Sequence, residues 1–126
     1  MKIASQALFA VACVMAAACV LLAAYVAHQG ADLPAPALRS VQSALQMQQF
    51  HSLALLLVAW MGMGPRAHNL HLWSGVLFLL GLLMFSVNIL LIHLAGVDAF
   101  RAATPYGGMA FVAAWLMLIG TLRVKH

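Results

Sequence analysis

Residues 48–60 read QQFHSLALLLVAW, a polar cluster that runs without a helix-breaking residue into an apolar segment. A membrane-spanning helix needs about 20 mostly apolar residues, and Gly64 and Pro65 end this one. Counting back from Gly64 places the start of the span near Leu45. His51 then lies about 9 Å below the membrane surface, at about 1.5 Å per residue. An ionisable side chain at that depth is a candidate functional site, because polar groups are expensive there.

The composition indicates that the whole chain is a membrane protein. Hydrophobic residues make up 66% of its 126 residues and charged residues only 6%, whereas soluble domains carry about 25% charged residues. A mass of 13.5 kDa leaves no room for an anchor plus a separate soluble domain, so we expect one transmembrane domain over residues 1–126. The lipid bilayer is its expected partner. The cations lie at the ends of apolar segments, which indicates topology and not a nucleic-acid-binding patch.

Polar and Pro/Gly-rich breaks divide the chain into four apolar segments. They predict helices over approximately residues 4–28, 40–63, 70–95 and 105–123, that is, an all-α integral membrane four-helix bundle. The first segment also resembles a secretory signal peptide, with Ala16-Ala17-Ala18 as a candidate cleavage site. We expect this segment to be retained as a span.

The positive charges predict how the bundle is oriented. One side carries Lys2, Arg66, Arg123 and Lys125, while the other carries Arg39 and Arg101, each with an acid in its loop, Asp32 and Asp98. Because cytoplasmic loops carry the excess of Lys and Arg, we expect both termini in the cytoplasm. His68, His71 and His126 then lie on the cytoplasmic side, and we interpret them as interfacial side chains without a ligand role.

Two stretches resemble the motifs of one known family. Residues 47–54, MQQFHSLA, resemble its aromatic-Gln-x-aromatic-His-x-Leu-Ala motif, and residues 104–111, TPYGGMAF, are similar to its Thr-Pro-x-Gly-Gly-x-x-Phe motif. This is the domain-of-unknown-function 423 family, which includes YgdD-like bacterial inner-membrane proteins and the eukaryotic transmembrane protein 256. The resemblance extends over nearly the whole chain. It implies a four-helix protein of the bacterial inner membrane and supplies no established activity.

The chain departs from the family pattern in two places. Residues 23–26, AAYV, stand where the family usually has glycines, just before the shared Ala27-His28. After the shared Phe85-Ser86, residues 87–90 read VNIL, where the family usually has Gly-Ser-Leu-Tyr. The tyrosine hydroxyl of the family is therefore missing, and Asn88 keeps a polar group at the serine position.

The first functional hypothesis is a non-enzymatic bundle that binds a lipid, a quinone-like molecule or a membrane partner, including a second copy of itself. No span contains an acid, and the chain has no nucleophile–base pair or phosphate-binding loop. We expect His51 to face the bundle interior, where Gln48 and His51 would bond to Asn88, to Thr104 or to carbonyls near Pro105. The candidate polar cluster comprises Gln48, His51, Asn88, Thr104, Pro105, Gly107 and Gly108.

Two alternatives remain open. His28, His51 and possibly His93 all fall toward the outer side and could hold a metal ion or a haem, since neutral imidazole is a common metal ligand. Against this, no pair among them has the i, i+4 spacing of a helical metal motif. The other alternative is a small transporter or proton relay, because intramembrane histidines serve in such relays. The sequence does not identify a cofactor.

Overall fold

The computed structural model describes residues 1–123, so Lys125 and His126 lie outside the described residues. Within this range the chain is helical and has no strand, as predicted. The helices are α1 (Lys2–Gln29), α2 (Ala35–Met63), α3 (Asn69–Gly81), α4 (Asn88–Leu94) and α5 (Thr104–Gly120). A π-helical segment, Leu82–Val87, joins α3 to α4. Short 3₁₀ turns cover Gly30–Asp32, Arg101–Ala103 and Thr121–Arg123.

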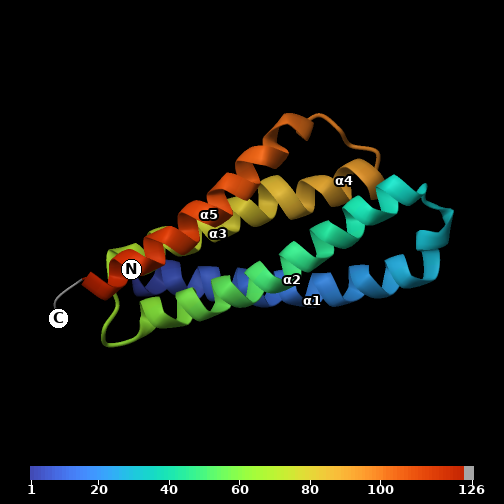
Figure 1. The fold of residues 1–126 in the computed structure, drawn as a ribbon. Helices are drawn as coiled ribbons and strands as arrows, with labels where there is room; N and C mark the ends of the chain where they lie inside the picture. The colour runs from blue at the N-terminus through green and yellow to red at the C-terminus, as the bar shows by residue number, and fades with distance from the viewer. Residues whose placement is uncertain (124–126) are drawn as a thin grey trace.

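The helices form two hairpins that pack side by side (Figure 1). The first hairpin is α1 with α2, and the second is α5 with the continuous rod of α3, the π-helical segment and α4. Helices α2 and α3 join the two hairpins. One end of the bundle, the terminal end, carries the N-terminus, the end of α5 and the connection 64–68; the other, the far end, carries the connections 30–34 and 95–103 (Figure 1).

Three of the four predicted spans are long and apolar enough to cross a membrane: Lys2–Asp32, Asn69–Leu94 and Arg101–Arg123. Helix α2 has 29 residues but is not among the candidate membrane spans that the described residues contain. Its polar residues lower its hydropathy, and three of them, Gln48, His51 and Ser52, are buried inside the bundle. Helix α2 carries 11 buried residues, spread over successive turns from Val41 to Gly62.

Several helix ends differ by one to five residues from the predicted boundaries, and α5 ends at Gly120 rather than near residue 123. Helix α2 begins at Ala35 rather than near residue 40, because Pro36 stands in the first turn, where its missing N–H would have no partner anyway. The third predicted helix ends at Leu94, where Gly96 adopts a positive φ of 69°. The N–H of Val97 then donates to the carbonyl of Leu91 at 3.0 Å, which closes the helix end.

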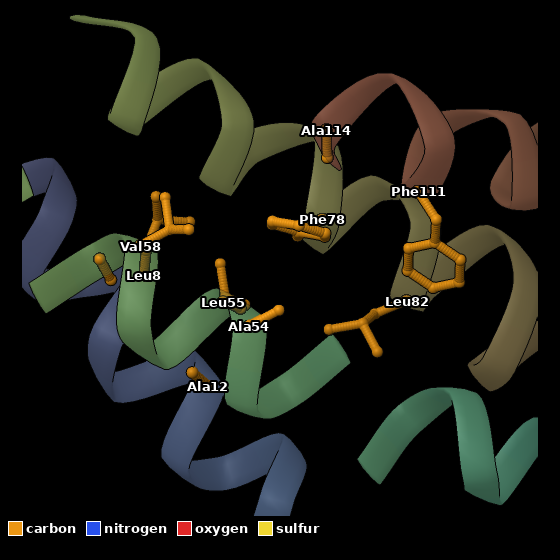
Figure 2. Packing of buried hydrophobic residues seen from close by; sticks show 10 residues of the cluster. Leu8, Ala12, Ala54, Leu55, Val58, Phe78, Leu82, Phe111 and Ala114 are labelled. Carbon is orange, nitrogen blue, oxygen red and sulfur yellow. The ribbon is translucent and has the colours of Figure 1, made fainter. Parts of the chain in front are cut away.

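Buried apolar side chains form two separate clusters. The larger one joins α1, α2, α3, the π-helical segment and α5 (Figure 2) and comprises Leu8, Ala12, Ala54, Leu55, Val58, Ala59, Phe78, Leu82, Phe111 and Ala114. The smaller one lies nearer the far end and comprises Cys19, Val26, Val41, Ala44, Leu45 and Leu90. Ser86 is four residues from both Leu82 and Leu90, and Gln48 and Ser52 lie between Leu45 and Ala54. The stretch of the interior between the two clusters is therefore polar.

Two glycines allow α5 to approach α3 and the π-helical segment closely. A Cβ atom on Gly107 would lie 2.6 Å from the backbone nitrogen of Phe85. One on Gly81 would contact the ring of Phe111 and lie 3.0 Å from the carbonyl oxygen of Gly107. Small residues at such crossings let membrane helices gain close van der Waals contact, since apolar burial does not drive their association in lipid.

Candidate functional site

His51 faces the interior of the bundle, as the sequence predicted. It is 5% exposed, and its ring stacks on that of Phe111 of α5, with centroids 3.7 Å apart and planes 10° apart. The ring of Phe50 meets it edge-on at 5.2 Å. Phe78 of α3 lies 5.8 Å away. An imidazole from α2 is thus held among aromatic rings from three helices.

Both ring nitrogens of His51 have hydrogen-bond partners. Nδ1 lies 2.9 Å from the carbonyl oxygen of Met47, one turn earlier in α2. The indole Nε1–H of Trp115 donates to Nε2 at 3.2 Å. Because a carbonyl only accepts and an indole N–H only donates, these partners assign the neutral ring with its proton on Nδ1. The predicted partners of His51, namely Asn88, Thr104 and the carbonyls near Pro105, were wrong, because the ring points to the middle of α5.

Gln48 turns toward α1 instead of toward Asn88 or Thr104. Its Nε2 donates to the carbonyl oxygen of Met15 at 2.9 Å, which corrects the prediction that it bonds near Pro105. Its Oε1 is buried without a protein partner, as are the hydroxyls of Ser52 and Ser86. These three side chains make up the polar stretch between the two apolar clusters.

Asn88 and Thr104 form a second polar contact at the far end. Nδ2 of Asn88 lies 2.6 Å from the carbonyl oxygen of Phe100, 3.1 Å from Oγ1 of Thr104 and 3.2 Å from the carbonyl oxygen of Met84. The contact fixes the start of α5 against α4. Pro105 occupies the first turn of α5 and is exposed. The seven residues of the predicted cluster therefore separate: His51, Gln48, the Asn88–Thr104 pair and the tightly packed Gly107 each have their own surroundings.

A cavity of ≈ 660 Å³ lies at the terminal end, where no motif had indicated a site. Its walls are the end of α2 and the turn Thr121–Arg123 that follows α5, and its remaining lining comes from residues 64–68 and the start of α3. The lining side chains include Trp60, Met61 and Met63 of α2, Arg66 and His68 of the connection, His71 of α3, and Thr121 and Leu122 after α5. We had interpreted His68 and His71 as interfacial side chains without a ligand role, but both line this cavity.

Comparison with known proteins decides the family. The family model described as "Protein of unknown function (DUF423)" matches residues 22–108, more than half of the chain. The chain belongs to this family. It is 37% identical over 87 residues to the UPF0382 inner membrane protein YgdD of Escherichia coli (strain K12), which covers 68% of this chain and 66% of the relative. It is 35% identical over 78 residues to the UPF0382 membrane protein SH2409 of Staphylococcus haemolyticus (strain JCSC1435), covering 62% of each.

These matches confirm a membrane protein of the DUF423 family. The aligned region spans about two thirds of the length of these relatives. No solved structure matches the chain. The matched residues include His51, Asn88 and Thr104, whereas Phe111 and Trp115, the two α5 partners of His51, lie just beyond them.

The predicted three-histidine metal or haem site does not form in this DUF423 chain. His28 is exposed at the end of α1, and His93 lines a separate small cavity beside Tyr25 and Asp32. His51 has both ring nitrogens engaged inside the bundle. Among residues 1–123 no group of three or more His, Cys, Asp or Glu side chains could hold a metal ion.

Proposed function

We propose that this DUF423 protein is a non-enzymatic membrane protein that binds a lipid-like amphiphile in the terminal-end cavity. The cavity itself carries the proposal. Its volume of ≈ 660 Å³ falls in the range of about 300–1,000 Å³ that is usual for small-molecule sites. Its lining is mostly apolar, with a few polar groups toward the connection 64–68. This combination suits a molecule with an apolar tail and a polar head.

The position of the cavity between two helix ends favours a ligand that arrives from the bilayer. Helices α2 and α5 both pack on α3, and the side chains that join them to each other, His51, Phe111 and Trp115, lie away from the cavity lining. At the rim, Trp60 is 64% exposed and Leu122 84% exposed. In a membrane these apolar side chains face lipid, so the space between the two helices opens sideways to acyl chains.

The His51 cluster supports a structural role better than a proton relay. A relay group has to exchange protons with successive partners, but His51 accepts from an indole that cannot accept a proton in return. Its ring also stacks directly on Phe111. We propose that His51 crosslinks α2 to α5 and sets the spacing of the cavity walls.

The charge distribution favours the terminal end as the cytoplasmic end. Its described cations, Lys2, Arg66 and Arg123, have no acidic side chain near them in the chain, whereas Arg39 and Arg101 share the far end with the only two acids. Cytoplasmic connections carry the excess of Lys and Arg. We therefore propose that the cavity lies at the inner leaflet.

Replacing Thr121 with tryptophan is expected to expel the bound amphiphile, because the indole would fill the space between the ends of α5 and α2. The wild-type protein and the variant would be purified in the same detergent, and native mass spectrometry would count the lipid molecules that each retains. We expect about one retained lipid per wild-type chain and at least a fivefold lower occupancy in Thr121→Trp.

Ile119→Trp is the matched control, because Ile119 lies two residues earlier, in the last turn of α5, and is 55% exposed, away from the cavity lining. It should retain the lipid as wild type does. Equal lipid retention by all three proteins would overturn the proposed function.

A further inference from the structure

The mouth of the terminal-end cavity carries hydrogen-bond donors and positive charge without a balancing acid. Arg66 lines the cavity and is exposed, and His68 lines it two residues later. The chain has only two acidic side chains, Asp32 and Asp98, and both lie in the far-end connections. Given the proposed function, on which this step rests, we infer that the bound amphiphile has an anionic phosphate headgroup held by Arg66 and His68.

The hydrogen bonds of His68 fix which of its ring atoms can donate. Its Nδ1 accepts the backbone N–H of Leu70 at 3.2 Å as part of the cap of α3. In the neutral ring the proton therefore sits on Nε2, which leaves Nε2–H as a donor. The cap also limits rotation of the ring, so this donor is held in place before any ligand binds.

Arg66 supplies the charge. A guanidinium stays charged at any working pH and presents several N–H donors in one plane, which matches the oxygen atoms of a phosphate. Lys2 and Arg123 add positive potential at the same end of the bundle. A neutral quinone has no negative charge that could pair with these cations, so the site favours a phospholipid.

The apolar part of the lining gives the tail its place. Trp60 and Met61 on α2 and Leu122 after α5 all line the cavity. Toward the membrane centre, the hydrogen bond from Trp115 to His51 joins α2 and α5 again, about 10 Å further along the helices at about 1.5 Å per residue. The headgroup therefore binds at residues 66–68. The acyl chain lies between α2 and α5, in the space that runs from these residues to the hydrogen bond between Trp115 and His51.

The test offers the full-length protein an equimolar mixture of phosphatidylglycerol and phosphatidylcholine with identical acyl chains, and native mass spectrometry measures the occupancy of each. We expect wild type to prefer phosphatidylglycerol about tenfold, the effect of one net charge-assisted contact. Arg66→Gln should lose this preference. Lys2→Gln, which removes a cation from the same end but outside the cavity lining, should keep it.

Each other outcome contradicts the inference in a distinguishable way. If both lipids bind equally but Thr121→Trp expels both, the cavity binds amphiphiles and only the anionic headgroup is wrong. If Lys2→Gln loses the preference as fully as Arg66→Gln, the general surface charge selects the lipid and the site at residues 66–68 does not. If inorganic phosphate at the same concentration displaces the lipid, the site recognises free phosphate. If neither lipid is retained, the proposed function itself fails.

Discussion

Replacing Gly107 with alanine is expected to lower the free energy of unfolding by about 2 to 3 kcal/mol, the range of an overpacked interior contact. The added Cβ would lie 2.6 Å from the backbone nitrogen of Phe85 and 2.9 Å from the carbonyl carbon of Met84. Backbone atoms cannot rotate aside as a side chain can, so α5 and the π-helical segment would have to separate. That separation would also loosen the contact around Gly81.

Thermal unfolding in detergent, followed by the loss of helical circular dichroism, measures this effect. The matched control is Gly108→Ala, one residue away in the same helix, where an added Cβ meets no atom within 4 Å. Alanine favours helix over glycine by up to about 1 kcal/mol, so Gly108→Ala should unfold at the wild-type temperature or higher. Equal midpoints for the two variants would show that α5 and the π-helical segment do not cross as closely as described.

His51→Ala is expected to destabilise the protein by about 3 kcal/mol, the low end of the range for removing a buried aromatic side chain. The change removes the stack on Phe111 and leaves the indole N–H of Trp115 without its acceptor, whereas the carbonyl of Met47 keeps its helical hydrogen bond. An unpaired donor is costly here, because no water reaches it within the bilayer.

The unfolding midpoints of two further variants separate the contribution of the ring stack from that of the hydrogen bonds and provide a control. His51→Phe keeps a ring against Phe111 and removes both hydrogen bonds, so it should fall between wild type and His51→Ala. His28→Ala removes an exposed histidine at the end of α1 and should leave the midpoint unchanged. A wild-type midpoint for His51→Ala would mean that this histidine does not crosslink α2 and α5.

The class of fold could be predicted from the sequence because apolar segment length and helix-breaking residues act locally. The π-helical segment Leu82–Val87 could not, since it contains no Gly or Pro that would mark a break. The mean hydropathy of α2 did not show how the helix packs: its polar residues lower the average, yet Gln48, His51 and Ser52 are buried inside the bundle. Whether a helix with polar residues fits into the bundle depends on how those residues are buried against other helices. The mean hydropathy of one helix does not show this.

The candidate site was predictable only in part. The burial of His51 followed from its depth in an apolar segment, but its partners depend on how α2 and α5 are rotated, so Phe111 and Trp115 were missed. The terminal-end cavity was missed as well. It joins Trp60 to Thr121, residues 61 positions apart in a chain without a repeated motif between them. No spacing in the sequence marks such a contact.

The most direct test of the lipid-binding proposal is an experimental structure of the protein crystallised from a lipid mesophase that contains phosphatidylglycerol. The proposal predicts elongated non-protein density between α2 and α5, with its head beside Arg66 and its tail against Trp60 and Leu122. Side chains of α2 and α5 that meet each other across this space, with no density between them, would contradict it.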